Sequence, residues 1–152
     1  RSSDLKVSQK GYQGIPPSYS KLLVDDKHET LTVKNEIFLW GMKNLPKPLT
    51  AKLPQTLEEA QSPAFRDIVY DVDKDGHPGI TISAKGMIDG ELHAVQRRVT
   101  QFNGKALSPD RQAGRVNVIR ESIILESTTY LIGEGPRTPA QHPDPKRSWF
   151  AF

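Results

Sequence analysis

The strongest constraint on the fold of this chain is a period-two alternation of apolar and polar side chains between residues 79 and 132. Such alternation is typical of strands with one face buried and the other in solvent. Asp89-Gly90 and Asn103-Gly104 interrupt it, and both dipeptides favour two-residue hairpin turns because their residues tolerate positive φ. We therefore predict two consecutive hairpins, in which 79–88 pairs with 91–102 and 91–102 pairs with the segment after the second turn.

Shorter strand signals lie on both sides of this region. They are apolar runs or alternating stretches, several of them rich in β-branched side chains. Three aromatic residues close the chain, and so much apolar surface predicts a final strand that docks on the sheet. The further predicted strands cover residues 29–34, 37–40, 68–70, 116–119 and 122–132.

One segment, residues 56–67, has a helical signal. Thr56-Leu57-Glu58-Glu59 has the form of a capping box, in which Thr56 caps the amide three residues on and Glu59 reaches back. Pro63 interrupts the pattern, so we expect only one or two turns of helix.

These signals predict an all-β fold with a minor helix, because hairpins follow one another with almost no helical pattern between them. We expect an antiparallel meander that is barrel-like or a sandwich, and the tight turns between neighbours favour the barrel. The chain divides into an extended N-terminal arm (1–20), an antiparallel β domain (21–132) and an irregular, proline-rich C-terminal segment (133–152). The last segment ends in the docked aromatic strand, which contains Trp149, Phe150 and Phe152.

Composition excludes several functional classes. Cysteine is absent, which rules out disulfides, cysteine-ligated zinc and thiol chemistry. The net charge of +3 comes from scattered Lys and Arg, so we expect no nucleic-acid partner, and no apolar window predicts a transmembrane segment. A start at Arg1 leads us to expect a processed chain that is exported to the periplasm, the outer membrane or the extracellular space.

An acidic stretch at residues 71–77 carries the most specific chemistry. Asp71, Asp73 and Asp75 alternate along it, and Gly76 follows where a tight loop must turn. Carboxylates at every second position can converge on one point when the chain curls, and together they favour a hard divalent cation with oxygen ligands, most naturally Ca²⁺. The alternative is an acidic, solvated turn that holds no ion.

This stretch resembles the Asp-x-Asp-x-Asp-Gly calcium loops of EF-hands and thrombospondin type 3 repeats, and also those of dockerins and integrin propellers. The resemblance covers residues 71–82. It implies that the three aspartates are ligands and that His77 contributes its backbone carbonyl. The sequence departs from the EF-hand pattern at its twelfth position, where Ile82 replaces the bidentate Glu, and a strand follows the loop in place of a helix. Water or a distant carboxylate such as Asp67, Asp89 or Glu91 would then complete the coordination. The bound ion would be structural rather than regulatory.

Other charged and polar residues give weaker signals. No two of the four histidines stand at a metal-ligand spacing on a helix, so the sequence gives no support for zinc catalysis, and His93, inside a strand, is expected to be packed or half-exposed. Arg97 could be an inward-facing anion anchor, but an outward arginine paired with Glu121 or Glu126 is the favoured interpretation. No nucleophile motif or phosphate-binding glycine loop occurs.

We therefore expect a non-catalytic binding or assembly domain, such as an accessory subunit of a larger complex, stabilised by Ca²⁺. Its protein partner would bind through the proline-rich termini, which bury little surface by themselves. The alternative is a barrel-type carrier of a small apolar ligand, and a third hypothesis is an enzyme of unknown class.

Overall fold

The computed structural model describes residues 4–7, 21–85, 89–108, 110–137, 144 and 148–151. The strands are β1 (Asp4–Val7), β2 (Leu22–Asp25), β3 (Thr30–Trp40), β4 (Ile80–Lys85), β5 (Gly90–Ser108), β6 (Arg111–Ser127), β7 (Gly135–Arg137) and β8 (Trp149–Ala151), and the helix is α2 (Leu57–Gln61).

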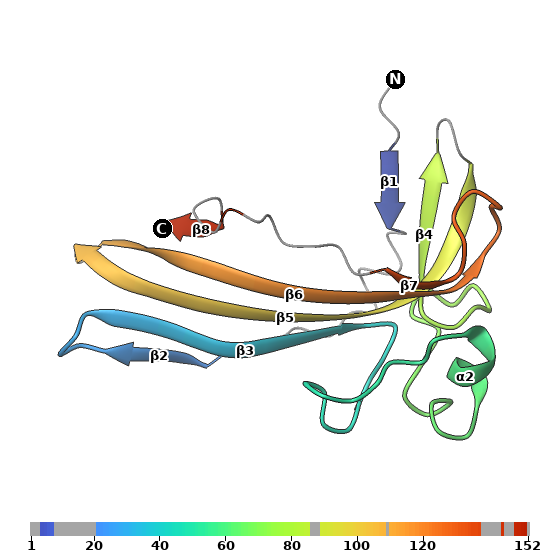
Figure 1. The fold of residues 1–152 in the computed structure, drawn as a ribbon, viewed down its shortest axis with the longest axis horizontal. Helices are drawn as coiled ribbons and strands as arrows, with labels where there is room; N and C mark the ends of the chain where they lie inside the picture. Colours follow the sequence, from blue (N-terminus) through green and yellow to red (C-terminus); the bar gives the residue numbers. More distant parts are fainter. Residues whose placement is uncertain are drawn as a thin grey trace. The chain divides into compact units, whose positions relative to one another are not determined.

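The all-β fold with a minor helix is confirmed. Hydrogen bonds join the strands in the order β1-β4-β5-β3-β2, with β6 beside β5, and with β7 and β8 beside β6 (Figure 1). Within the described residues this path has two open ends, so the sheet is not closed and the predicted barrel is wrong. The tight turns that favoured a barrel connect neighbouring strands equally well in an open meander.

Contacts divide the chain into two compact units. Unit 1 comprises residues 1–17, 39–97 and 121–138, and unit 2 comprises residues 18–38, 98–120 and 139–152. Strands β3, β5 and β6 contribute residues to both units.

The predicted division at residues 20 and 132 stays a prediction. Most of the predicted N-terminal arm and Phe152 lie outside the described residues. At the other end of the chain, β8 pairs antiparallel with β6, with Trp149 opposite Arg115.

Unit 1 holds the hydrophobic core. One cluster joins the ends of β5 and β6 to the helical segment and includes Leu53, Val95, Ile123 and Leu125, none of which exposes surface. A second cluster of Val72, Ile80 and Ala94 lies where the acidic loop enters β4. Because large apolar side chains surround both ends of the acidic loop, the core holds its stems in place.

Two glycines allow three backbone segments to meet near Ala94. Gly41 follows β3, Gly79 precedes β4, and both have positive φ, of +72° and +103°. A Cβ on Gly41 would lie 2.7 Å from the Cα of Gly79, and a Cβ on Gly79 would overlap the carbonyl oxygen of Ala94. Only glycine fits both the backbone conformation and the space at these positions.

The first hairpin exists, but its predicted turn is wrong. Ile80–Lys85 and Gly90–Ala94 pair in the register Ala84↔Gly90, so Gly90 is a strand residue and the connection is longer than two residues. Residues 86–88 of this connection lie outside the described residues. Gly90 has a packing role, because a Cβ there would lie 3.0 Å from the Cβ of Thr129.

The second predicted turn, at Asn103-Gly104, is also wrong, because β5 continues through it to Ser108. The chain reverses between Ser108 and Arg111. A Cβ on Gly114 of β6 would overlap the carbonyl oxygen of Asn103 and lie 2.8 Å from its carbonyl carbon. Gly104 is therefore part of a close contact between two strands. Glycine permits such a close approach as readily as it permits a turn.

Three smaller predictions of strands need correction. The segments 29–34 and 37–40 form the single strand β3, and 116–119 and most of 122–132 form β6, which ends at Ser127. The predicted strand at 68–70 is only an isolated bridge, from Met42 to Val69.

The predicted helix is present as α2. Thr56 caps it by accepting a hydrogen bond from the Glu59 amide at 3.1 Å. The Glu59 carboxylate accepts from the amide of Gln55 at 2.6 Å, one residue earlier than a capping box requires.

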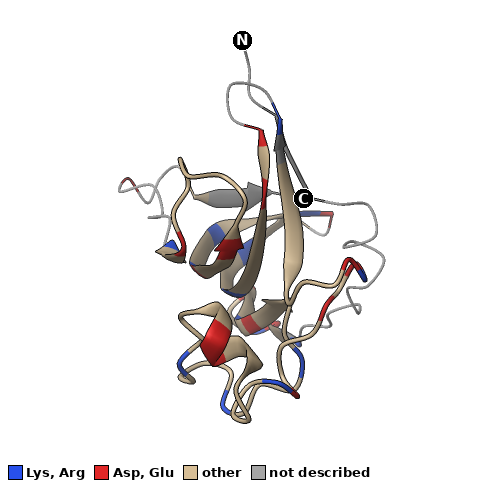
Figure 2. Ribbon diagram, turned by 90° about the vertical axis from the view of Figure 1, so that its right-hand side faces the viewer, with Lys and Arg blue, Asp and Glu red and all other residues tan. Residues whose placement is uncertain are grey.

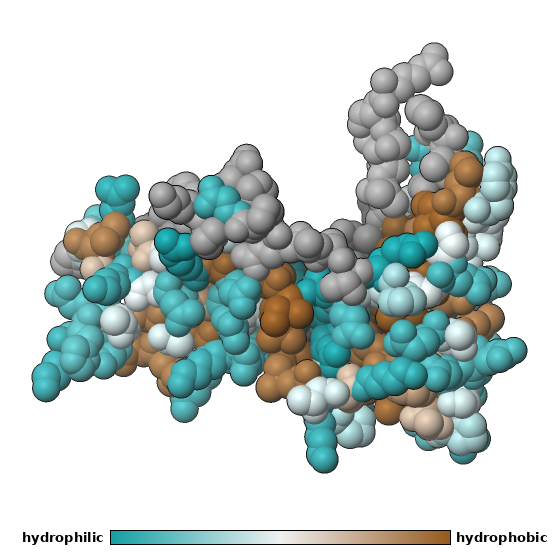
Figure 3. All heavy atoms as spheres, in the orientation of Figure 1, coloured by the Kyte–Doolittle hydropathy of each residue, from teal (hydrophilic) through white to brown (hydrophobic). Residues whose placement is uncertain are grey.

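Unit 2 has few buried side chains. Leu31, Val99 and Thr100 are its buried residues among those described. On its exposed surface Gln101 bonds to Asn35 at 2.8 Å and to Asn117 at 3.1 Å, which links three strands through side chains. Basic and acidic residues are scattered among other residues along the described ribbon, and hydrophilic side chains cover much of the visible face (Figures 2 and 3).

Candidate metal centre

The acidic loop closes on itself in unit 1. The amide of Val72 donates to the carbonyl of Gly79 at 3.0 Å, and the amide of Gly79 donates to the carbonyl of Tyr70 at 3.0 Å. One carboxylate oxygen from each of Asp71, Asp73 and Asp75 lies within 4.8 Å of the other two, a spacing at which they could hold a metal ion. We call these three residues the aspartate group.

Asp71 organises the turn of the loop. Its Oδ1 accepts from the amides of Lys74 at 2.6 Å and Asp75 at 3.3 Å, and its Oδ2 accepts from the amide of Gly76 at 2.8 Å. Lys74 and Gly76 both have positive φ, of +60° and +94°, which turns successive amides towards this carboxylate. A carboxylate has about four lone-pair sites, so these bonds leave Asp71 able to ligate a cation.

The other two aspartates are fixed by β4. Asp73 is only 5% exposed, and its Oδ2 accepts from the amide of Thr81 at 3.2 Å. Asp75 accepts from the amide of His77 at 2.9 Å and from the hydroxyl of Thr81. The strand that follows the loop thus performs part of the positioning that a helix performs in an EF-hand.

Electrostatics favour a cation at this point. Two ionised carboxylates about 5 Å apart repel each other by roughly 3 kcal/mol at an effective dielectric constant of about 20, and by less where water reaches them. Asp73 is buried and Asp75 is exposed, so screening differs across the group. A divalent cation would convert three repulsions into attractions, which is why such clusters bind hard ions.

The carboxylates predicted to complete the coordination do not join the aspartate group. Among the described residues the group contains three acidic side chains, without Asp67, Asp89 or Glu91. Asp67 forms a long, exposed ion pair with Arg66. Further oxygen ligands would therefore be water or backbone carbonyls.

The side chain of His77 belongs to a second group. A nitrogen of His77, a nitrogen of His93 and an oxygen of Glu126 all lie within 4.8 Å of one another, and we call these residues the histidine group. Of the two alternatives for His93, packed or half-exposed, the packed one is correct, because His93 is 1% exposed. No sequence signal connects His93 or Glu126 with His77. Only the pairing of β4 with β5, which places Thr81 opposite His93, brings the two histidines together.

Hydrogen bonds shift two pKa values at these groups. Burial raises the pKa of Asp75. The Thr81 hydroxyl, the His77 amide and the two nearby imidazoles together lower this pKa by more than burial raises it, so the net shift is downward. The hydrogen bond that His77 donates to the Glu126 carboxylate raises the pKa of His77, and burial opposes this effect less strongly. Asp75 is therefore ionised at neutral pH.

Arg97 is paired with Glu121, as the favoured interpretation expected, but it is largely buried rather than outward. Its guanidinium bonds to the carboxylate of Glu121, and it also donates to the carbonyls of Pro48 at 3.0 Å and Ala51 at 2.7 Å. The side chain is 12% exposed, so it ties the loop before α2 to β5 and β6 from a largely buried position. Glu126, the other predicted partner, bonds to His77 instead.

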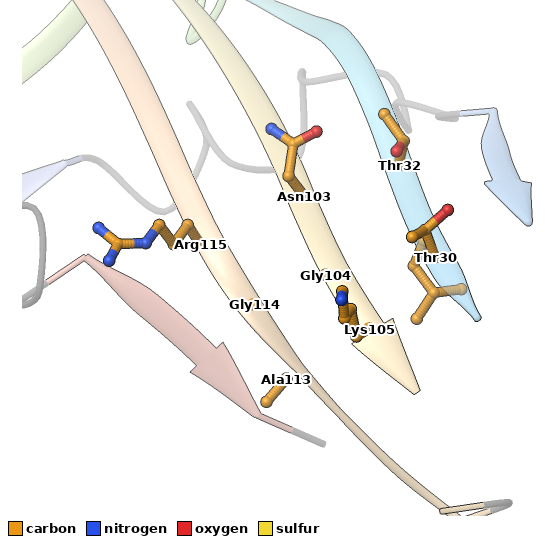
Figure 4. A pocket seen from close by; sticks show the side chains of 9 residues that line it. Thr30, Thr32, Asn103, Gly104, Lys105, Ala113, Gly114 and Arg115 are labelled. Carbon is orange, nitrogen blue, oxygen red and sulfur yellow. The ribbon is translucent and has the colours of Figure 1, made fainter. Parts of the chain in front are cut away.

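A groove of about 430 Å³ lies in unit 2. Figure 4 shows it over the facing glycines Gly104 of β5 and Gly114 of β6, with Thr30 and Thr32 on the neighbouring strand β3 and Arg115 next to Gly114 on β6. The groove follows from the missing side chains at the glycines. It is an open surface feature rather than the enclosed apolar interior that a barrel carrier requires.

Comparisons with protein-family models, with curated proteins and with solved structures find no match to this chain. None of the described helices has the length and apolar character that crossing a membrane would need.

Proposed function

We propose that this chain is a non-catalytic binding or assembly domain of an exported or envelope protein, and that Ca²⁺ bound by the aspartate group stabilises its fold. The observation that carries the proposal is the convergence of Asp71, Asp73 and Asp75 within 4.8 Å on a loop whose stems are hydrogen-bonded. All three ligands are carboxylate oxygens, which suit a hard cation.

Calcium suits the site better than magnesium. Mg²⁺ demands a near-ideal octahedron, whereas Ca²⁺ accepts six to eight oxygens in variable geometry. The Asp71 and Asp73 carboxylates are already fixed by amide donors, so their positions are set by the loop rather than by the ion. Ca²⁺, which accepts a variable geometry and several water ligands, is compatible with such a site.

Isothermal titration of the full chain with Ca²⁺ tests this part of the proposal. Asp71→Asn keeps one acceptor oxygen for the loop amides, replaces the other oxygen by an NH2 group, and removes one charge from the aspartate group. Asp67→Asn is the matched control, because Asp67 is an exposed aspartate outside the group. We expect tight binding by the wild type and Asp67→Asn, and at least tenfold weaker binding by Asp71→Asn. Equal binding by both variants would contradict the assignment.

The binding role has a separate support. Tyr130 is 93% exposed and Leu131 is 55% exposed, next to each other just beyond the end of β6. A protruding aromatic residue beside an apolar one is typical of the anchor positions at protein interfaces. This pair adds a contact surface in unit 1 to the predicted contacts of the termini.

Photo-crosslinking in the native host tests the binding role. A crosslinker at position 130 should give one discrete adduct, whose partner is identified by mass spectrometry and recovered again with the partner as bait. A crosslinker at position 67, where the side chain is 89% exposed, is the control and should give no such adduct. The same adducts from both positions would count against a specific interface.

The carrier hypothesis is not proposed further, because it required a closed barrel and the described sheet is open. An enzyme has no further support from the aspartate group, whose three candidate ligands are carboxylate oxygens.

A further inference from the structure

We propose that the histidine group is a second metal site, in which His77, His93 and Glu126 bind a divalent ion of the Zn²⁺, Ni²⁺ or Cu²⁺ class. The three residues come from three elements of unit 1: the acidic loop, β5 and β6. Two imidazole nitrogens and one carboxylate oxygen lie within 4.8 Å of one another. Imidazole ligands suit these borderline ions, whereas Ca²⁺ requires oxygen.

The hydrogen bonds around His93 determine its tautomer. The ionised carboxylate of Asp75 can only accept, so the hydroxyl of Thr81 donates its proton to Asp75. The oxygen of Thr81 then accepts from His93 Nδ1, which lies 3.0 Å away. Nδ1 therefore carries the proton of the neutral ring, and Nε2 carries the lone pair.

This lone pair has no donor. His93 is 1% exposed, and its Nε2 is buried without a hydrogen-bond partner among the described residues. A buried acceptor left unsatisfied costs about 1–3 kcal/mol, so it needs a reason. A metal ion bound at Nε2 would satisfy the atom, and the chain from Nδ1 through Thr81 to Asp75 would orient the ring as in other metal-bound histidines.

His77 is the movable ligand. Its ring stacks on that of His93, with centroids 3.9 Å apart and planes 9° from parallel. Lone pairs lie in the ring planes, so one ring must tilt before both can reach the same ion. His93 is fixed by burial and by Thr81, whereas the side chain of His77 is 43% exposed on a loop. We therefore expect His77 to turn.

Glu126 supplies the third ligand. Its Oε2 lies 2.8 Å from His77 Nδ1, so it is already beside one imidazole, and its side chain is 35% exposed. Two histidines and a glutamate with one solvent-facing position form a ligand set that Zn²⁺ accepts in a tetrahedral site. The site shares no side-chain ligand with the aspartate group, so the two metal proposals are tested by different substitutions.

The experiment is a titration of the full chain with Zn²⁺ in buffer that contains excess Ca²⁺, so that Ca²⁺ competes for the aspartate group. Co²⁺ absorption reports coordination number, and the nitrogen hyperfine splitting of bound Cu²⁺ counts imidazole ligands. The variant is His77→Gln, because this exposed loop residue can change without disturbing the core. The control is His28→Gln, whose exposed side chain pairs with Asp25 in unit 2.

We expect stoichiometric Zn²⁺ binding by the wild type and by His28→Gln, at least tenfold weaker binding by His77→Gln, and two nitrogen ligands on Cu²⁺. Glu126→Gln should also weaken Zn²⁺ binding, whereas Asp67→Asn, outside both groups, should leave Zn²⁺ binding unchanged. Unchanged Zn²⁺ affinity in His77→Gln, or a wild type that binds no Zn²⁺ in the presence of Ca²⁺, would overturn the proposal.

Discussion

Replacing Gly79 by alanine should lower the free energy of unfolding by more than the backbone strain at position 79 alone accounts for. The φ of +103° costs a non-glycine residue roughly 1–3 kcal/mol. In addition, the new Cβ would overlap the carbonyl oxygen of Ala94 and lie 2.9 Å from its carbon, both of them backbone atoms of a central strand. Forced overpacking of this kind typically costs a further 1–3 kcal/mol.

The two contributions sum to about 4 kcal/mol, or a fall in melting temperature of about 8–16 °C for a chain of this size. Gly135→Ala is the matched control, because Gly135 has a φ of +102° and a Cβ there would meet nothing within 4 Å. Thermal unfolding by circular dichroism, with chelator present, separates the two contributions. If Gly79→Ala melts no lower than Gly135→Ala, the three-segment junction near Ala94 is not tightly packed and the reasoning is refuted.

Three further predictions concern unit 1. Leu53→Ala should lower the free energy of unfolding by about 2–5 kcal/mol in a denaturant titration, because the side chain is fully buried and leaves a cavity; a loss under about 1 kcal/mol would contradict this. Arg97→Met should cost about 1–3 kcal/mol, and a double-mutant cycle with Glu121→Gln should show coupling between them, whereas additive effects would not fit the pair. In chelator, Glu126→Gln should lower the pKa of His77 in an NMR titration, because the pKa of His77 is raised by Glu126. The stability from this bond should be fully present below the ordinary histidine pKa of 6.5 and lost as the pH rises through the folded pKa, and a pH-independent difference between the proteins would refute it.

Local patterns predicted the elements of this fold better than their connections. The strand class, the cap at Thr56 and the acidic loop all depend on neighbouring residues, and such signals can be read directly from a sequence. Both hairpin turns were misplaced because Gly90 and Gly104 are used for close packing. A glycine that permits a turn and a glycine that permits a close approach have the same sequence signature.

The same contrast between local patterns and chain connections applies to the two candidate sites. The aspartate group comes from one stretch of chain, so its spacing was visible in the sequence. The histidine group depends on the register that places Thr81 opposite His93 and on the position of Glu126 near the end of β6. The turn signals predicted a strand register that is wrong by several residues. No local pattern could therefore have shown that these side chains lie close together.

If Ca²⁺ stabilises this fold through the aspartate group, as we propose, the full chain should melt at a higher temperature in Ca²⁺ than in chelator. At a Ca²⁺ concentration about 100 times the dissociation constant, binding only to the folded state adds about 2.7 kcal/mol. This corresponds to a rise of about 5–10 °C for a chain of this size. We predict that rise for the wild type and its loss in Asp71→Asn. Equal melting temperatures of the wild type in saturating Ca²⁺ and in chelator would contradict the claim.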